Sequence, residues 1–370
     1  MIQDVYIIGA TGNVGKTLVR QICEKGDTNP DLHPNPTRIV GLASSTHTIY
    51  SAFGLSKEDS YDFISRKSKS AKKYNSLFDL LNRARVRLRD EESNLVFIDV
   101  TALSEPMREF HLHVIEHTPY GIVTANKNPI ALYDYKTFKK LTHDTKRYGY
   151  RCSVMAGADA VPLIQDNRDL NDRPRIIEGC FSGTLGYITT GLEKGIAFSE
   201  IVREAFRRNY TEPHPRDDLS GLDVARKLIV LARTAGFPVS LNDIQREPFI
   251  PEAYLTEMDV ESFMSKITKL DGWFSDKMQQ ARARDNTLRY VAKMDVQGQD
   301  IAMRVALTEV PNNSTLGNLK GTLNALILLT DAGPDEQEPP LIKPGAGLGI
   351  TARNIRRDLL HLLPERRNMI

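Results

Sequence analysis

The feature that most constrains the fold is the amino-terminal order of a short strand, a glycine-rich turn and a helix. The run Asp4–Gly9 has the apolar, β-branched and aromatic composition of a buried strand. It stops at the turn Gly9-Ala10-Thr11-Gly12-Asn13-Val14-Gly15. Apolar residues then follow at helical spacing at Leu18, Val19 and Ile22. This order is typical of the first βαβ unit of a dinucleotide-binding domain.

The three glycines of this turn fit the steric needs of a bound dinucleotide. Gly9 permits a tight turn, Gly12 lets a pyrophosphate approach the backbone, and Gly15 lets the helix pack closely on the strand. The free N–H groups and the positive dipole end of the helix then face the phosphates. The spacing is G-x-x-G-x-x-G rather than the commoner G-x-G-x-x-G, so an ordinary turn between a strand and a helix is the competing interpretation.

The second strand, predicted over Thr37–Ala43, bears on the choice of cofactor. An NAD-specific site places Asp or Glu at the end of this strand to bind the ribose 2′-hydroxyl. This chain has Ser44-Ser45-Thr46-His47 there, which does not repel a 2′-phosphate, so the sequence favours NADP and leaves NAD open. The basic stretch 66–73 could reach a phosphate, but a solvated surface loop is the preferred interpretation.

Two further predicted strands end in polar residues at the sheet edge where ligands bind. The strand Leu95–Val100 is followed by Thr101, a candidate cofactor contact unless it only caps a helix. The strand Gly121–Ala125 is followed at once by Asn126, and then by Lys127 where a nicotinamide is expected. Amphipathic helices are predicted over residues 77–94 and 129–147.

After residue 150 the pattern changes. Strand-like segments at 152–155 and 176–181 alternate with helices, which indicates a mixed sheet. The first half of the stretch 209–233 carries two prolines and is predicted to be rigid and non-helical. Ser220 is the predicted N-cap of the helix that follows.

Acidic and basic side chains gather in this stretch. Asp223 and Lys227 lie four residues apart, so they share one helical face. Two interpretations stay open: a solvated loop with a surface ion pair, or a site where carboxylates hold an ammonium group while Lys227 handles a proton. The residues that could converge on a small polar ligand are Glu212, Asp217, Asp218, Asp223 and Lys227.

The composition excludes several classes of protein. A chain of 370 residues has the length of two or three domains, and 49 Lys+Arg against 47 Asp+Glu give no electrostatic reason to expect nucleic acid or an anionic membrane as partner. The three cysteines (Cys23, Cys152 and Cys180) are too scattered for a disulfide framework. No apolar run approaches a membrane helix, and the first residues indicate a strand rather than a secretory signal. We therefore expect a cytoplasmic protein whose cysteines are kept reduced.

Several blocks of the sequence resemble the homoserine dehydrogenase family, most of all the dehydrogenase half of the bifunctional aspartokinase–homoserine dehydrogenases. The block Thr211–Arg233 resembles the family's catalytic motif, and Gly121–Lys127 resembles its strand-then-lysine motif. Further blocks that match the family in order are 179–188, 318–325 and 345–352. The resemblance spans almost the whole chain.

The resemblance implies an α/β protein with a Rossmann-type, doubly wound nucleotide-binding domain and an α+β catalytic and dimerisation domain with a mixed sheet. We expect the first domain over residues 1–150, the second over 151–340, and a segment 341–370 that returns to the first domain with a closing helix at 354–363. A homodimer through the second domain's sheet is also implied. Because the sequence shows no kinase and no regulatory amino-acid-binding domain, feedback inhibition through such a domain is not expected.

The reaction that the resemblance implies is the reversible, NAD(P)-dependent interconversion of L-homoserine and L-aspartate 4-semialdehyde, a step toward threonine, methionine and isoleucine. Lys227 would be the acid/base, and Lys127 would assist proton transfer beside the cofactor. The expected substrate-binding residues are Glu212 and Asp223, supported by Asp217 and Asp218. The expected cofactor contacts are Gly9, Thr11, Gly12, Asn13, Val14, Ser44, Thr101, Lys127, Gly345 and Gly347.

The family also has a segment whose backbone carbonyls bind a monovalent cation, and residues 152–162 resemble it only loosely. The carbonyls of Val154, Ala156 and Ala158 would be the ligands of a sodium or potassium ion. Arg151 stands near where the family has an acidic ligand, which argues against such a site.

Three alternatives stay open from the residues. The turn Gly9–Gly15 also resembles that of aspartate-semialdehyde dehydrogenases, which need a nucleophilic cysteine that no motif here supplies. Tyr135 and Lys139 fit the Tyr-x-x-x-Lys pattern of short-chain dehydrogenases, a match that chance readily produces in a chain with 13 tyrosines. The non-enzyme alternative is a sensor or regulator that binds NADP without chemistry, and it leaves Asp223 and Lys227 unexplained.

Overall fold

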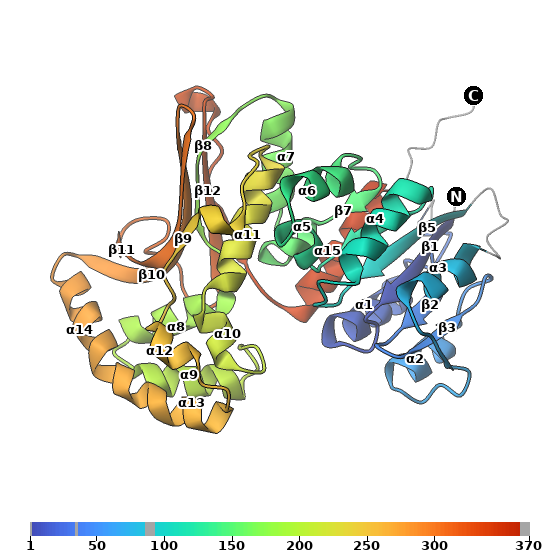
Figure 1. The fold of residues 1–370 in the computed structure, drawn as a ribbon, viewed down its shortest axis with the longest axis horizontal. Coiled ribbons are helices and arrows are strands. Elements are labelled where there is room, and N and C mark those ends of the chain that lie inside the picture. The colour runs from blue at the N-terminus through green and yellow to red at the C-terminus, as the bar shows by residue number, and fades with distance from the viewer. Residues whose placement is uncertain (1, 34–35, 86–92, 363–370) are drawn as a thin grey trace. The chain divides into compact units, whose positions relative to one another are not determined.

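The computed structural model describes residues 2–33, 36–85 and 93–362, and the chain divides into two compact units. Unit 1 comprises Met1–Gly157 and Gly347–Ile370, and unit 2 comprises Ala158–Ala346. Figure 1 shows the elements of both units. Unit 2 is thus inserted between two parts of unit 1. Within the described ranges, no helix is both long enough and apolar enough to cross a membrane.

Unit 1 is built on a parallel sheet with an antiparallel edge. Its described strands are β1 (Ile2–Ile8), β2 (Thr37–Ala43), β3 (His47–Tyr50), β4 (Lys72–Lys73), β5 (Ser93–Asp99), β6 (Gly121–Thr124) and β7 (Tyr148–Gly149). Their order across the sheet is β4-β3-β2-β1-β5-β6-β7. The five strands β2, β1, β5, β6 and β7 pair in parallel. At the edge, β3 pairs antiparallel with both β2 and β4.

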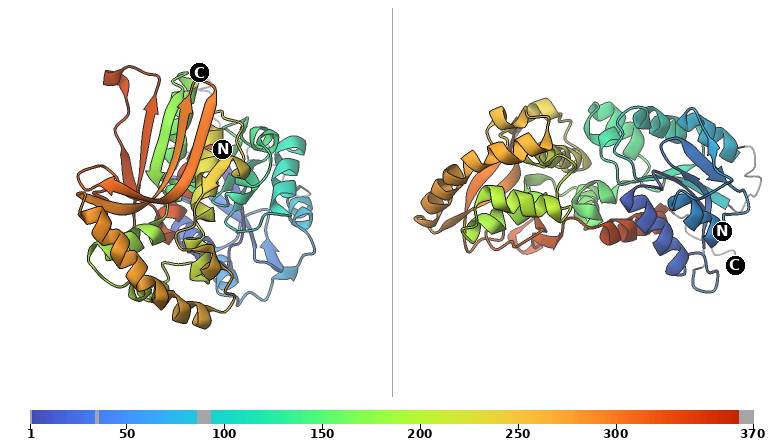
Figure 2. Two further views of the ribbon diagram at one scale, coloured as in Figure 1. Left: turned by 60° about the vertical axis from the view of Figure 1, so that its left-hand side comes forward. Right: turned by 90° about the horizontal axis from the view of Figure 1, so that it is seen from below.

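Helices cover both faces of this sheet (Figures 1 and 2). They are α1 (Asn13–Glu24), α2 (Lys57–Ile64), α3 (Leu77–Arg85), α4 (Met107–His117), α5 (Asn128–Ala131), α6 (Tyr135–Thr142) and α15 (Leu348–Leu362). One face carries an aliphatic core in which Ile7 packs with Leu18 of α1 and Ile355 of α15. The other face is aromatic, with the rings of Phe97 and Phe110 of α4 at 5.1 Å between centroids. This doubly wound arrangement confirms the predicted fold class.

Unit 2 is built on a mixed sheet. Its strands are β8 (Pro174–Cys180), β9 (Ile244–Arg246), β10 (Asn286–Gln297), β11 (Asp300–Pro311), β12 (Leu323–Thr330) and β13 (Leu341–Pro344). They lie in the order β13-β12-β8-β10-β11-β9, and all neighbours pair antiparallel except β11 and β9. Figure 2 shows the long strands β10 and β11 of this sheet.

The helices of unit 2 bury one side of the sheet. They are α7 (Ala160–Asp169), α8 (Gly183–Glu193), α9 (Phe198–Arg207), α10 (Pro215–Leu219), α11 (Leu222–Thr234), α12 (Glu252–Leu255), α13 (Val260–Lys266) and α14 (Asp271–Arg282). The helices α8, α11 and α14 pack on β10. Stacked rings of Phe198, Phe249 and Phe274 fill the space between the helices.

Two predicted elements of unit 1 are wrong. The helix expected over 129–147 is two short helices, α5 and α6, because the Asp134 side chain accepts the backbone N–H of Thr137 and so starts a new helix. The strand expected at 152–155 is a pair of 3-10 turns, η1 (Arg151–Ser153) and η2 (Met155–Gly157), in which Ala156 has left-handed backbone with φ 51°.

Two other element bounds differ from their predictions. Part of the helix expected over 77–94 falls on residues 86–92, outside the described residues, but β5 already begins at Ser93. The closing helix, α15, begins at Leu348, six residues before its predicted start. Helix ends depend on caps and tertiary contacts that the apolar period does not encode.

Candidate functional site

The glycine turn after β1 has the geometry that its sequence predicts. Gly9 has φ +89°, a backbone conformation that residues with a Cβ rarely adopt. A Cβ on Gly15 would lie 2.4 Å from the Gly9 carbonyl oxygen, so only glycine lets α1 pack this closely on the turn. Gly12 and Asn13 are exposed at the start of α1, where the first N–H groups of the helix are available to an anion.

Several predicted cofactor residues lie beside this turn. The N–H groups of Gly9 and Ala10 donate to the Ala43 carbonyl oxygen at 3.0 and 2.9 Å, so the end of β2 and hence Ser44 adjoin the turn. A Cβ on Gly9 would lie 3.2 Å from the Thr101 side chain. The ends of β1, β2 and β5 thus bring three predicted contacts together at the carboxyl edge of one sheet, where such sheets bind ligands.

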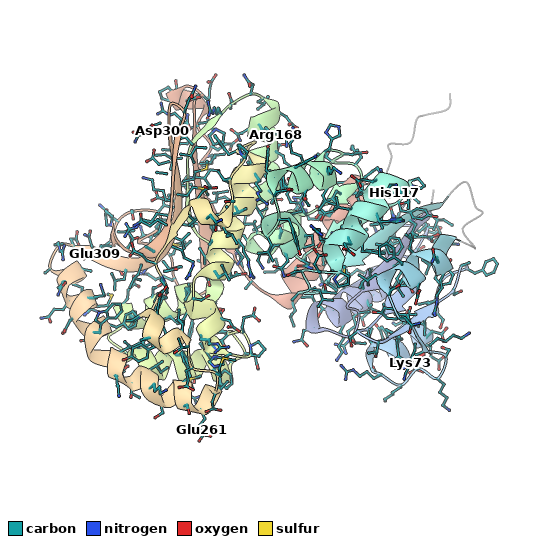
Figure 3. The ribbon with its side chains drawn as sticks, viewed as in Figure 1. Lys73, His117, Arg168, Glu261, Asp300 and Glu309 are labelled. Atoms are coloured by element: carbon teal, nitrogen blue, oxygen red, sulfur yellow. The ribbon has the colours of Figure 1, made fainter. Side chains whose placement is uncertain are left out.

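The end of β2 forms a tight hairpin with β3. The Ser44 hydroxyl accepts the His47 N–H at 3.0 Å, and the Tyr74 hydroxyl donates to the Ser44 carbonyl at 2.6 Å. No carboxylate stands in the connection 44–46. Lys73, on the edge strand β4, is the cross-strand neighbour of His47 on β3. A basic side chain (Figure 3) therefore stands beside the hairpin.

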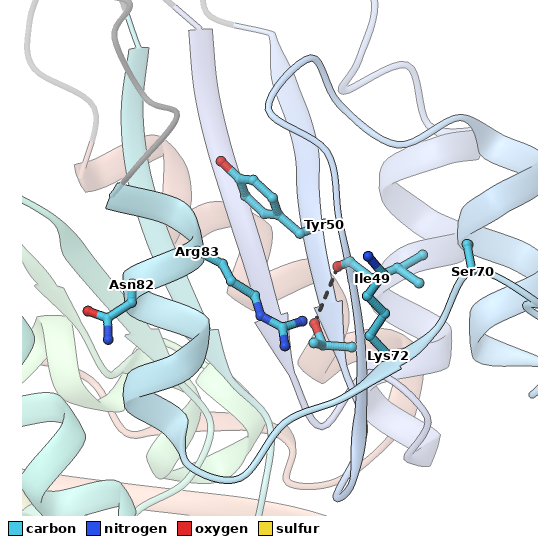
Figure 4. Close-up of a pocket in the computed structure, with 7 residues that line it drawn as sticks. Ile49, Tyr50, Ser70, Lys72, Asn82 and Arg83 are labelled. Carbon is cyan, nitrogen blue, oxygen red and sulfur yellow. Dashed lines mark hydrogen bonds between the residues drawn. The ribbon is translucent and has the colours of Figure 1, made fainter.

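A pocket of about 570 Å³ lies beside β3 (Figure 4). Lys72 and Arg83 line it together with Thr48, Tyr50 and uncharged side chains. The Arg83 guanidinium also donates to the Lys73 carbonyl oxygen at 3.1 Å. The basic stretch that the sequence assigns to a solvated loop is exposed over most of its length, but Lys72 belongs to this cationic pocket.

Sequence reasoning missed a buried polar cluster at the ends of β5 and β6. The Asp99 carboxylate accepts the Thr101 N–H at 2.8 Å and the Asn126 side-chain amide at 2.9 Å. Asp99 is 1% exposed and Asn126 is 4% exposed. Lys127 follows Asn126 directly and is the N-cap of α5. The available signal was an acidic residue closing an apolar strand, directly before the predicted contact Thr101.

In unit 2 the predicted lysine lies among polar partners. The Lys227 ammonium contacts the Asp223 carboxylate at 2.8 Å and donates to the Phe181 carbonyl oxygen at 2.7 Å. The Lys227 side chain is 13% exposed and that of Asp223 is 41% exposed. Lys227 is therefore mostly withdrawn from water, yet its charge is paired and its ammonium is held in place.

Three of the four predicted acids form one group that includes Asp223, the partner of Lys227. The Asp218 carboxylate accepts the Glu212 N–H at 2.7 Å, and the charges of Glu212 and Asp223 both act on it. Burial, aided by these two carboxylates, raises the pKa of Asp218 to about 6. Asp217 is set apart, because its side chain is 57% exposed and faces Arg216 at 3.6 Å.

Thr184 of α8 is a further polar group at this site that the sequence did not single out. Its hydroxyl donates to the Tyr210 carbonyl oxygen at 2.5 Å and bonds to Asp218. The Ser182 hydroxyl caps the helix by accepting the Leu185 N–H at 3.2 Å. The start of α8 therefore contacts Asp218, which is a neighbour of the Asp223 carboxylate that pairs with Lys227 of α11.

The local fold of this stretch differs from its prediction. Residues Pro215–Leu219 form α10, with proline at the first turn where no N–H is needed, so the expected non-helical half is wrong. Gly221 rather than Ser220 is the N-cap of α11, with φ +71°. A Cβ on Gly221 would lie 1.8 Å from the Tyr290 hydroxyl oxygen, so close packing demands the glycine.

The predicted contacts Gly345 and Gly347 fall on either side of the unit boundary. A Cβ on Gly345 would lie only 1.9 Å from the Asn324 amide, so only glycine at this position leaves room for the Asn324 side chain. Asn324 is 0% exposed, and neither of its amide atoms has a hydrogen-bond partner in the described part of the chain. Such a group is normally satisfied by water or a ligand.

Two of the three carbonyls expected to bind a cation, those of Val154 and Ala156, already accept hydrogen bonds. The Val154 carbonyl accepts the Gly157 N–H at 3.0 Å, and the Ala156 carbonyl accepts the Asn354 side-chain amide at 2.8 Å. The Arg151 guanidinium pairs with Asp358 of α15 at 3.1 Å, and both side chains are 7% exposed. Ala158 begins unit 2. Arg151, near the place where an acidic cation ligand would be expected, is thus held in a buried ion pair.

The thiols do not suit nucleophilic chemistry. Burial raises the pKa of Cys180 to about 12, and it also raises the pKa values of Cys23 and Cys152. An aspartate-semialdehyde dehydrogenase would need a reactive thiolate. The Tyr-x-x-x-Lys match lies on α6. Its Lys139 is exposed, and its Tyr135 ring stacks on the Phe138 ring with 5.9 Å between their centroids.

The fold combines a doubly wound unit, of the kind that binds dinucleotides, with a second unit built on a mixed sheet. The family model of homoserine dehydrogenase matches residues 162–360, more than half of the chain. The chain therefore belongs to the homoserine dehydrogenase family.

Individual relatives agree with this assignment. A bifunctional aspartokinase/homoserine dehydrogenase of Buchnera aphidicola is 33% identical over 367 residues, which are 97% of this chain and 42% of that protein. The chain thus spans less than half the length of that relative. A Candida auris protein of unknown function has a solved structure with 25% identity, TM-score 0.83 and coverage of 98% of both chains. A hyperthermophilic archaeal homoserine dehydrogenase in complex with NADPH has 19% identity, TM-score 0.70 and coverage of 97% of both chains, and shares the fold.

Proposed function

We propose that this chain is an NAD(P)-dependent homoserine dehydrogenase that interconverts L-homoserine and L-aspartate 4-semialdehyde. The observation that carries the proposal is Lys227, whose ammonium is held between the Asp223 carboxylate and the Phe181 carbonyl within the family's catalytic block. A surface ion pair does not explain a lysine that is 13% exposed with a main-chain partner from another element.

The acids around Lys227 suit the amino-acid end of the substrate. Glu212 and Asp223 are carboxylates within electrostatic reach of Asp218, and together they favour an ammonium group. Asp218 holds the Glu212 backbone and so fixes the loop between α9 and α10. Asp217 is exposed and is assigned a supporting role only.

The proton steps belong to lysines. The bound nicotinamide supplies or accepts the hydride at its C4 position. In the reducing direction the Lys227 ammonium donates a proton to the oxygen on which negative charge develops, and in the oxidising direction its amine accepts that proton from the hydroxyl of homoserine. Asp223 holds the ammonium in place for this step. Lys127, at the carboxyl end of β6, assists beside the cofactor.

The cofactor residues of the proposal are those at the carboxyl edge of unit 1 and at the returning segment. They are Gly9, Thr11, Gly12, Asn13, Val14, Ser44, Thr101, Lys127, Gly345 and Gly347. NADP is the preferred cofactor, because the β2–β3 connection lacks a carboxylate and has Lys73 beside it. The NADPH complex of the archaeal relative supports this choice.

Three further properties complete the proposal. A monovalent cation is not assigned a role, because Asn354 already donates to the Ala156 carbonyl in the segment that would hold it. The working form is a homodimer that pairs through the face of the unit 2 sheet opposite its helices. A cytoplasmic location stays a prediction from the sequence.

The deciding experiment is a spectrophotometric assay. Purified protein receives NADP and L-homoserine, and the absorbance of reduced cofactor is followed. We expect homoserine-dependent reduction, with D-homoserine and L-serine as control substrates that give less. Cofactor binding without any turnover would instead favour the sensor, and inactivation by thiol alkylation would revive the acyl-transfer alternative.

A further inference from the structure

The loops after β5 and β6 are tied to each other by buried side chains. Asp99 ends β5, and its two carboxylate oxygens accept the Thr101 N–H at 2.8 Å and the Asn126 side-chain amide at 2.9 Å. The first bond shapes the loop after its own strand, and the second reaches the loop after the neighbouring strand. One carboxylate therefore joins both loops.

The Asn126 amide extends this link. Its nitrogen donates to the Leu103 carbonyl at 2.7 Å and lies 3.3 Å from the Thr101 hydroxyl, while its oxygen accepts the Asn128 N–H at 3.1 Å. The Asn128 amide in turn donates to the Ala102 carbonyl at 2.8 Å. Every polar atom of the Asn126 side chain is used, and most of its partners lie in the two loops.

The main chain below the loops reinforces the same junction. Asp99 is paired with Thr124 across the two strands, and its carbonyl accepts the Ala125 N–H at 3.0 Å. Behind the carboxylate, His111 Nε2 lies 3.4 Å from Asp99 and His111 Nδ1 lies 2.9 Å from the Tyr148 hydroxyl. His111 is 0% exposed, so this side of the carboxylate is closed to water.

We propose that Asp99, Asn126 and Asn128 form a clamp that positions Thr101 and Lys127 for the cofactor. The inference rests on the proposed function, in which these two residues contact NADP and Lys127 assists the proton step. Loops at such an edge are normally the adaptable parts of the fold. A clamp fixes them before binding, which lowers the ordering cost of cofactor binding and keeps the Lys127 amine within the geometry of the reaction.

The clamp residues act through others, so the test must separate positioning from folding. Asp99→Asn keeps the shape of the side chain but replaces one acceptor oxygen by a donor that faces the Asn126 amide. We expect the dissociation constant for NADPH, measured from its fluorescence, to rise on the order of tenfold or more, and kcat to fall by a similar factor. KM for homoserine should change less, because its ligands lie in unit 2.

Two comparisons make the test specific. The double variant Asp99→Asn with Asn126→Asp returns one carboxylate and one amide to the junction, and we expect part of the NADPH affinity to return. Asp271→Asn is the matched control, since Asp271 likewise accepts a backbone N–H and a hydroxyl, from Ser199 at 2.7 and 2.9 Å, in unit 2. It should lower the melting temperature and leave the dissociation constant for NADPH unchanged.

The outcomes distinguish the clamp from the proposed function. NADPH affinity and kcat of Asp99→Asn equal to those of an active wild type would overturn the clamp. If Asp99→Asn does not fold, Asn128→Ala removes only the outer bond, and unchanged NADPH affinity in that variant would also overturn it. A wild type that binds NADPH but does not oxidise homoserine would sink the proposed function, while the binding comparison would still decide the clamp.

Discussion

The two contacts of the Lys227 ammonium differ in how far the sequence predicts them. The spacing of Asp223 and Lys227 predicts their pairing, which the structure shows at 2.8 Å. The second partner, the Phe181 carbonyl, lies 46 residues away in the sequence, in the connection between β8 and α8. A main-chain carbonyl carries no residue type to recognise, so this contact could not be predicted from local pattern. For Asp99 the sequence offered a signal, but its partner Asn126 is 27 residues away and on the loop after another strand.

Replacing Lys227 tests the proton step. We expect Lys227→Ala to lower kcat on the order of 10²–10⁴-fold, the usual effect of losing a general acid/base. Lys227→Arg should not restore it, because arginine does not release its proton at working pH. Steady-state kinetics in both directions measure the effect, with Lys194→Ala, an exposed lysine at the end of α8, as control. Full kcat in Lys227→Ala would remove this residue from the mechanism.

Asp218 predicts a pH dependence of stability. Its pKa is raised from 3.8 to about 6 in the fold, so the folded state binds the proton more tightly than the unfolded chain. The stability from this group is therefore fully present below pH 3.8 and is lost as the pH rises through about 6.

Melting temperatures across this pH range measure the slope. Asp218→Asn should remove this slope, so the stability of the variant relative to the wild type should be roughly 1–2 kcal/mol higher at neutral pH than at acid pH. The exposed Asp217→Asn is the control. Parallel pH profiles for Asp218→Asn and the wild type would contradict the assignment.

Elements follow from the sequence where their signal is local. The β1 strand, the turn Gly9–Gly15 and α1 combine an apolar run, a positive φ and a helical period, and all three are predicted. Prediction fails where a cap or a distant contact decides, as at Asp134 within the expected helix 129–147. It also fails at Ser220, since the neighbouring Gly221 starts α11 for a reason that lies on β10, the close approach of Tyr290.

The residues of the β2–β3 hairpin are expected to decide between NADP and NAD. Ser44→Asp keeps an oxygen for the His47 N–H but places a carboxylate where a 2′-phosphate would lie. We expect the preference for NADP over NAD, as the ratio of kcat/KM values, to fall on the order of tenfold or more. Ser44→Asn, which is isosteric and uncharged, is the control. An unchanged ratio in Ser44→Asp would place the 2′-phosphate elsewhere.

At the scale of the whole molecule, the exposed face of the unit 2 sheet bears on the proposed homodimer. Strand alternation places Leu329, which is 38% exposed, on the face opposite the buried Leu328. On the same face, Glu178 stands between Ile327 and Lys293 across the strands. This mixture of apolar and paired charged side chains suits a self-complementary contact between two copies.

Leu329→Glu tests that assembly. We expect the wild type to behave as a dimer in light scattering, and the variant to shift toward the monomer because a carboxylate would be buried in the contact. Leu170→Glu, at a residue that is 73% exposed beyond α7, is the matched control and should leave the mass unchanged. A monomeric wild type, or a variant with the wild-type mass, would place the contact elsewhere or remove it.

The return of α15 to unit 1 has a consequence for biosynthesis. Ala352, Ile355 and Leu359 of this helix complete the aliphatic core against β1 and α1. While the ribosome is still making residues 158–346, α15 does not yet exist, so the apolar face of unit 1 that it covers stays exposed. Unit 2 is one continuous segment of the chain, so all of its elements are synthesised before α15. Vectorial synthesis thus favours maturation of unit 2 before unit 1.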